Sequence, residues 1–166
     1  QNGASSVTSV DVGYAQFDWS LRNDRRVELL ERTNITSLPE MGYVDTFDVA
    51  VCDVSFTSIL SILPSVLEVL AADGVFVTLV KPQFEAKREE VGEGGIVTDA
   101  FVRLQTLQKV TDAFKEKQMG PLGACESPIH GAKGNVEYLL FGQVGAGQNN
   151  LDLASVVQKH SVEIMK

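Results

Sequence analysis

The arrangement of apolar segments constrains the fold of this chain more than any other feature of the sequence. Short apolar runs of strand type alternate with longer segments in which apolar residues recur at helical spacing. The run at 47–52 is apolar on both faces, which is typical of a strand inside a parallel sheet. This alternation predicts an α/β domain in which helices cover both faces of a mostly parallel sheet.

Local patterns place the individual elements. Asp73 and Gly74 are expected to end the second main helix. The last two strands are separated by a short loop, so we expect them to pair antiparallel. The expected strands lie at 7–12, 27–32, 47–52, 75–80, 122–126 and 136–144, and the expected helices at 17–23, 57–72, 97–118 and 149–165.

Composition narrows the classes of function. The chain has 166 residues and a net charge of −8, so its overall charge does not indicate a nucleic-acid-binding surface. No apolar run approaches the length of a membrane span, and no membrane association is expected. Cys52 and Cys125 fit no metal-site spacing and are expected to be buried free thiols, as in a reducing, cytoplasmic setting.

Polar residues stand where the expected parallel strands end, which is the edge where open α/β sheets place their sites. Asp11 ends the first strand and could accept hydrogen bonds from a ribose diol, or it could be a turn aspartate bonded to its own backbone. Asp53 ends the most apolar strand and could serve the site or cap the following helix.

Lys81 ends the apolar strand 75–80 and is followed by Pro82, which fixes the backbone where the lysine side chain departs. A lysine near carboxylates could act as a base or as a cation that stabilises developing negative charge, and the sequence leaves both roles open. Glu137 interrupts the last apolar strand, and strand alternation alone does not decide whether it faces solvent or the site.

Six motifs, in order along the chain, resemble one family, the hemolysin A-like (TlyA) ribosomal RNA 2′-O-methyltransferases, whose catalytic domain is similar to FtsJ/RrmJ. Together they are specific, whereas each alone would be weak. They are DVGYAQFDWSLR (11–22), ERTN (31–34), CDVSF (52–56), VKPQFE (80–85), GGIV (94–97) and GNVEY (134–138).

The resemblance implies a Rossmann-like class I methyltransferase sheet, mostly parallel with an antiparallel last strand. It also implies an enzyme that uses S-adenosylmethionine to methylate a ribose 2′-hydroxyl of ribosomal RNA in ribosomal subunits. The family has a Lys-Asp-Lys-Glu tetrad, of which Asp53, Lys81 and Glu137 match the last three members. Cofactor binding is expected from the segments of Asp11 and Val12 and of Thr33 and Asn34, together with Asp53.

The chain departs from the family pattern at its start, where the glycine-rich cofactor loop and the first tetrad lysine have no match. We therefore expect 1–144 to be a methyltransferase domain incomplete at its N-terminus, without its first strand, and 145–166 to be a linker and C-terminal helix of the same domain. Strands left unpaired could promote self-association. Two other functions stay open: an inactive RNA- or cofactor-binding fragment, and a membrane-active hemolysin, which the mixed charge of 151–165 disfavours.

Overall fold

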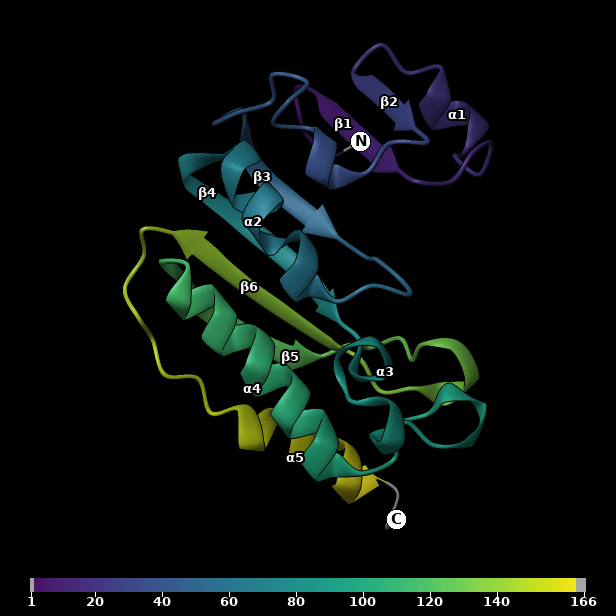
Figure 1. Cartoon of the computed structure of the whole chain (residues 1–166), viewed down its shortest axis with the longest axis vertical. Helices are drawn as coiled ribbons and strands as arrows, with labels where there is room; N and C mark the ends of the chain where they lie inside the picture. Colours follow the sequence, from purple (N-terminus) through teal and green to yellow (C-terminus); the bar gives the residue numbers. More distant parts are fainter. Residues whose placement is uncertain (1, 164–166) are drawn as a thin grey trace.

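The computed structural model describes the chain from residue 2 to residue 163. Strands and helices alternate along the sequence, as the apolar pattern predicts (Figure 1). The strands are β1 (Val7–Asp11), β2 (Val27–Glu31), β3 (Phe47–Cys52), β4 (Leu70–Val80), β5 (Met119–Glu126) and β6 (Tyr138–Val144). The helices are α1 (Trp19–Arg22), α2 (Ile59–Val69), α3 (Pro82–Glu85), α4 (Ala100–Glu116) and α5 (Leu153–Glu163), with 3₁₀ turns η1 (Ile35–Ser37), η2 (Arg88–Glu90), η3 (Glu93–Gly95) and η4 (Ala132–Gly134).

The strands form two separate sheets. The pair β1–β2 is parallel, and the larger sheet has the order β3-β4-β6-β5. In that sheet β3 and β4 are parallel, whereas β6 lies between β4 and β5 and runs antiparallel to both. The expected antiparallel pairing of the last two strands in the sequence is therefore confirmed. In Figure 1 the pair β1–β2 lies beyond β3, so that the edges of β1 and β3 face each other. No described strand lies between these two edges.

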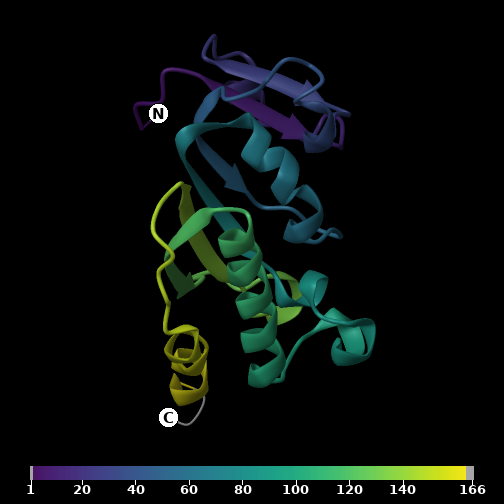
Figure 2. The ribbon, with the colours of Figure 1, turned by 60° about the vertical axis from the view of Figure 1, so that its left-hand side comes forward.

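One face of the larger sheet carries the core. Helices α2 and α4 lie on the same side of the sheet (Figure 2), and α5 packs against α4 and β5. Phe76 from β4 and Phe114 from α4 are fully buried, and their ring centroids are 5.6 Å apart. The large aromatic and aliphatic side chains between the two layers provide most of the apolar burial that stabilises the fold.

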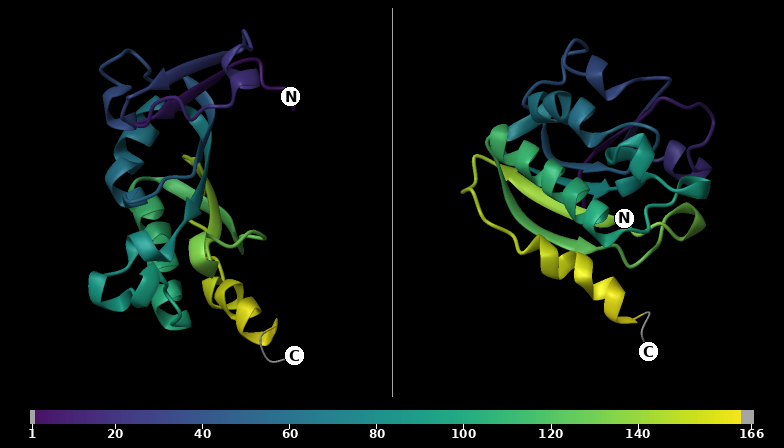
Figure 3. Two further views of the ribbon diagram at one scale, coloured as in Figure 1. Left: turned by 90° about the vertical axis from the view of Figure 1, so that its right-hand side faces the viewer. Right: turned by 60° about the horizontal axis from the view of Figure 1, so that its bottom comes forward.

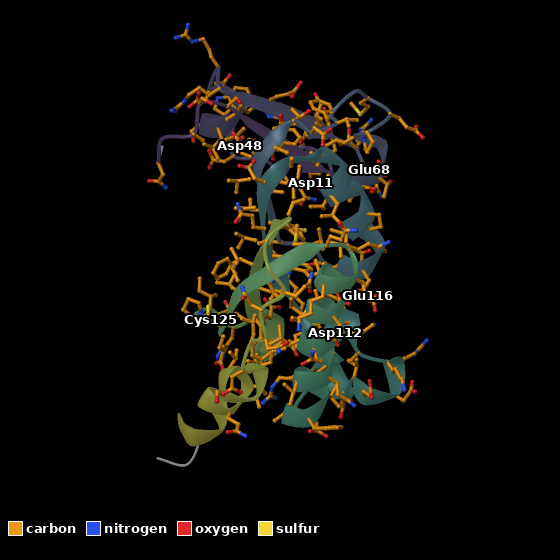
Figure 4. The ribbon with its side chains drawn as sticks, turned by 90° about the vertical axis from the view of Figure 1, so that its left-hand side faces the viewer. Asp11, Asp48, Glu68, Asp112, Glu116 and Cys125 are labelled. Carbon is orange, nitrogen blue, oxygen red and sulfur yellow. The ribbon has the colours of Figure 1, made fainter. Side chains whose placement is uncertain are left out.

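The opposite face of the sheet is apolar but open over β3. Val49 and Val51 point to this side, where 57% and 79% of their surfaces are exposed. Figure 3 shows the sheet at an angle that separates its two sides, and Figure 4 shows Asp112 and Glu116 of α4 on the side away from Cys125. Cys125 is exposed, so the expectation that it is a buried thiol was wrong. The expected helical cover is therefore present on one face of β3 among the described residues.

The boundary between α2 and β4 differs from the sequence-based expectation. The helix ends at Val69 and the strand begins at Leu70, whereas Asp73 and Gly74 were expected to stop the helix. The cause is tertiary pairing, because the backbone of 45–47 bonds to residues 68–70 and draws them into the sheet. Gly74 is buried within β4, where a Cβ atom would approach the Leu70 side chain to 3.0 Å.

The other boundaries differ by a few residues. Helix α4 begins at Ala100 because the Asp99 carboxylate accepts the hydrogen bond from the Phe101 N–H as an N-cap. Strand β5 starts three residues earlier than expected, at Met119. The expected end of the last helix, residue 165, lies outside the described part of the chain.

Candidate functional site

The carboxyl ends of β3 and β4 bring Asp53 and Lys81 together. The Lys81 Nζ lies 2.6 Å from Asp53 Oδ1 and donates a hydrogen bond of 3.0 Å to Ser55 Oγ. The Lys81 side chain is 12% exposed, while that of Asp53 is 71% exposed. A nearly buried cation thus meets a carboxylate that is open to solvent, as the strand-end argument predicts for this edge.

Pro82 explains why the lysine departs from the sheet at this point. It occupies the first position of α3, where its missing N–H costs no helical hydrogen bond. Lys81 keeps an extended backbone, with φ −108° and ψ 103°, as the residue before a proline prefers. The strand therefore ends at Val80, and Lys81 is the hinge between β4 and α3.

Glu137 approaches the same edge from β6. Val80 pairs with Tyr138 in the antiparallel ladder, so Glu137 lies opposite Lys81 by continuation of the register. Its side chain is 5% exposed, and its Oε1 accepts a hydrogen bond of 2.8 Å from Gln83 Nε2. Within the described residues, Lys81 forms its ion pair with Asp53 and not with Glu137.

A loop before β6 packs closely on Glu137. A Cβ atom on Gly131 would lie 2.1 Å from Glu137 Oε1, so a larger residue at this position would displace the Glu137 carboxylate. The loop is fixed by Asn135, whose side chain accepts from Val97 N at 3.1 Å and donates to Gly95 O at 2.9 Å. Two of the sequence motifs, GGIV and GNVEY, are therefore in direct contact and support Glu137.

The ends of β1 and β2 bring the remaining candidates together in a second group. Asp11 accepts from Gly13 N through Oδ1 at 2.7 Å, so the turn aspartate described above is present. Its backbone carbonyl accepts from Thr33 N at 3.0 Å, which joins the two segments. Asn34 caps the following turn through Thr36 N, and Val12 is 72% exposed. Asp11 is exposed as well, and its carboxylate retains capacity to accept further hydrogen bonds.

Cys52 lies directly before Asp53, and its thiol is largely shielded from solvent. Burial raises the pKa of this thiol to about 11. The charge of Lys81 lowers that pKa but does not offset the burial. The thiol is therefore neutral at ordinary pH. The charges at this edge of the sheet are those of Asp53 and Lys81.

An exposed aromatic side chain stands beside the Lys81–Asp53 pair. Phe56 is 91% exposed and has a positive φ of 62°, which is strained for a residue with a side chain. Its ring contacts that of Phe84, with 5.2 Å between the centroids. These two rings and Arg88 line one hollow on the surface. A larger hollow, of about 1000 Å³, lies between α2, α4 and α5 and contains none of the candidate residues.

Sequence reasoning missed three residues of this site. Gln83 and Glu85 lie within the VKPQFE motif, but their partners, Glu137 and the start of α2, are distant in the sequence. Gly131 lies in a glycine-bearing loop whose close approach to Glu137 has no local signature. Their proximity to Lys81 along the chain is the one signal that could have indicated Gln83 and Glu85.

Comparison with known proteins gives consistent matches. The model of the FtsJ-like methyltransferase family matches residues 1–144. The chain is 42% identical over 139 residues to the 16S/23S rRNA (cytidine-2′-O)-methyltransferase TlyA of Mycobacterium tuberculosis, covering 84% of this chain and 52% of the relative. It is 39% identical over 140 residues to hemolysin A of Brachyspira hyodysenteriae, covering 84% and 58% of the two chains.

A solved structure from Streptococcus thermophilus, provisionally named a hemolysin, superposes with a TM-score of 0.91 at 36% identity. The match covers 99% of this chain and 61% of that one. The present chain spans about half the length of the curated relatives it matches. No helix in the described part of the chain is long and apolar enough to cross a lipid bilayer.

Proposed function

This chain belongs to the FtsJ-like methyltransferase family, as its sequence motifs indicate, and on that premise we propose that it methylates a ribose 2′-hydroxyl of ribosomal RNA. The methyl donor in this proposal is S-adenosylmethionine, and the setting is cytoplasmic. The observation that carries the proposal is the contact between Lys81 and Asp53 at the carboxyl edge of the sheet, with Glu137 opposite Lys81.

The charges at this edge suit a reaction in which an alcohol oxygen becomes a nucleophile. Asp53 and Ser55 hold the Lys81 ammonium in place, and an ammonium has three N–H donors. Its remaining N–H can orient a 2′-hydroxyl and stabilise the negative charge that develops on the oxygen. We therefore favour Lys81 as a positioned cation, with the open Asp53 carboxylate as the group able to accept the hydroxyl proton.

The residues at the ends of β1 and β2 fit a nucleoside-containing donor. The exposed Asp11 carboxylate can accept from the two hydroxyls of a ribose, because among the described residues only Gly13 N donates to it, through Oδ1. Thr33 and Asn34 lie beside it through the bond between Thr33 N and Asp11 O, and Val12 offers exposed apolar surface. When bound there, S-adenosylmethionine supplies a methyl group attached to a sulfonium.

Phe56 and Arg88 fit the RNA side of the reaction. Single-stranded or extruded nucleotides are commonly recognised by stacking on exposed aromatic rings, and phosphates by cationic side chains. A ring that is 91% exposed beside the charged pair provides such a surface despite the net charge of −8. Ribosomal RNA is the substrate that the names of the curated relatives suggest, and in our proposal it is presented within a ribosomal subunit.

The test is methyl transfer from radiolabelled S-adenosylmethionine to ribosomal RNA, followed by nuclease digestion and mass spectrometry of the nucleosides. We expect a 2′-O-methylated nucleoside with the wild-type protein and none with Lys81→Ala or Lys81→Met. Lys117→Ala is the matched control, because Lys117 is exposed and lies at the end of α4. Undiminished transfer by both Lys81 variants would contradict the role of Lys81, and transfer to a base would contradict the reaction.

A further inference from the structure

The three candidate catalytic side chains lie directly beside the ends of three strands, and one short element touches the supports of all of them. We propose that helix α3 (Pro82–Glu85) is the positioning element of the site, with Glu85 and Gln83 as its two positioning residues. Glu85 holds the loop that carries Asp53 and Ser55, and Gln83 holds Glu137. The inference rests on the proposed function for its effect on catalysis, but its geometry can be tested without activity.

Glu85 is a buried carboxylate that joins α3 to the start of α2. Its side chain is 5% exposed. Its Oε2 accepts from Ser58 Oγ and its Oε1 from Ile59 N, both at 2.6 Å. Ser58 is also the N-cap of α2, where its Oγ accepts from Leu60 N at 3.1 Å. Among the described residues Glu85 has no cationic partner, so the first turn of α2 stabilises its charge.

Three contacts hold the loop of residues 53–58 against α3 and the lysine that precedes it. Lys81 contacts Asp53 and Ser55, the Phe84 ring contacts the Phe56 ring, and Glu85 contacts Ser58. The backbone of α3 is closed by Phe84 N to Lys81 O and anchored to α4 by Lys109 Nζ to Glu85 O, at 2.9 and 3.2 Å. Glu85 therefore ties Ser58, at the end of this loop, to the helix that follows Lys81.

Gln83 makes the corresponding contact on the other side of α3. Its amide Nε2 donates a hydrogen bond of 2.8 Å to Glu137 Oε1. A neutral amide donor can bind an ionised carboxylate in this way without neutralising its charge. Among the described residues no group donates to the buried Gln83 Oε1, so the bond to Glu137 is the contact that orients this side chain. Its position two residues after Lys81 links the placement of Glu137 directly to that of the lysine.

The first test measures the geometry without turnover. Lys81 is acetylated with a limiting amount of an amine-reactive reagent, and its rate is measured by peptide mass spectrometry relative to the exposed Lys87. We expect Glu85→Ala to raise the rate at Lys81 about tenfold, since it removes charge-assisted bonds that hold the loop. Glu85→Gln, which keeps an acceptor for Ile59 N, should restore most of the protection, whereas the exposed control Glu89→Ala should leave it unchanged.

An unchanged Lys81 rate in Glu85→Ala, measured where circular dichroism shows the variant folded, would overturn the role of Glu85. An equal increase at every lysine would also overturn it, because that pattern reports general unfolding. The result does not depend on methyl transfer, so it decides on the positioning role even if the wild-type protein transfers no methyl group and the proposed function fails.

The second test uses kinetics for Gln83. We expect Gln83→Met, which keeps the length and removes the donor, to lower kcat about ten- to a hundredfold with little change in KM for RNA or cofactor. Gln105→Met on the exposed side of α4 is the matched control. A KM effect without a kcat effect would place Gln83 in substrate binding instead, and wild-type kinetics would overturn its positioning role. Both outcomes are read on variants whose melting temperature is measured alongside.

Discussion

Because Gly131 packs closely on Glu137, we predict that the effect of Gly131→Ala on the free energy of unfolding depends on whether the Glu137 side chain is present. A Cβ atom on Gly131 would lie 2.1 Å from Oε1, 2.6 Å from Cδ and 3.3 Å from Cγ of Glu137. These three atoms are its nearest neighbours, so the steric conflict of Gly131→Ala is with this one side chain. The backbone of Gly131 is not among the glycines of positive φ, so alanine brings no conformational strain of its own.

The magnitude follows from two opposing effects. Overpacking against the buried Glu137 side chain costs about 1–3 kcal/mol, because Glu137 must move from its place beside Gln83. A glycine-to-alanine change without strain stabilises a protein by about 0.4–1 kcal/mol through the unfolded chain. In the Glu137→Ala background the conflict disappears, so the same Gly131→Ala change should become neutral or stabilising. The coupling between the two changes is then about 1–3 kcal/mol, because the contribution through the unfolded chain is the same in both backgrounds and cancels.

Urea denaturation of the wild type, the two single variants and the double variant measures this coupling, with circular dichroism as the signal. Methyl transfer should fall in Gly131→Ala, since the displaced carboxylate no longer faces Lys81. Additive free energies of unfolding, within about 0.5 kcal/mol, would refute the reasoning, because they would mean that Gly131 does not constrain Glu137.

Three further predictions use single side chains. Because burial raises the pKa of Cys52 to about 11, a thiol reagent at pH 8 should modify exposed Cys125 and leave Cys52 until the protein is unfolded; rapid reaction of both in the folded protein would count against it. Phe114→Ala should lower the free energy of unfolding by about 3–5 kcal/mol in urea, whereas Phe101→Ala, at a residue 63% exposed, should change it little; similar losses would contradict the described core. Phe56→Ala should weaken binding to ribosomal RNA by about 1–3 kcal/mol in a filter-binding assay and leave the melting temperature unchanged, and unaltered affinity would exclude a stacking role.

The sequence predicted the layout of the domain because its evidence is local. The apolar runs that became β3 and the end of β4, and the stripe of α4, carry the periodicity of their elements. It failed at Leu70, where an apolar segment can continue a helix or enter a strand, and pairing with Phe47 decided for the strand. Local propensity carries no information about that partner, so this boundary was out of reach.

The same distinction applies to the candidate site. Strand ends and motifs indicated Asp53 and Lys81, which the fold brings to 2.6 Å, because the carboxyl ends of parallel neighbours must meet. The supports of these groups could not be predicted in this way. Glu85 binds residues 26 and 27 positions away and Gln83 binds one 54 positions away, so their roles follow from the packing of α3 between β6 and α2.

The division of the strands into two sheets has a consequence for how the molecule opens. The strands β1 and β2 have five residues each and pair only with each other among the described strands. Strands β4 and β6, in contrast, lie inside a four-stranded sheet over the buried core. Local opening of β1–β2 therefore exposes little apolar surface and leaves the larger ladder intact. Amide protons of β1 and β2 should exchange with deuterated solvent well before those of β6. A ligand that bridges Asp11 and Asp53 would join the two sheets. Its binding should then slow amide exchange throughout β1 and β2, including at residues that it does not contact.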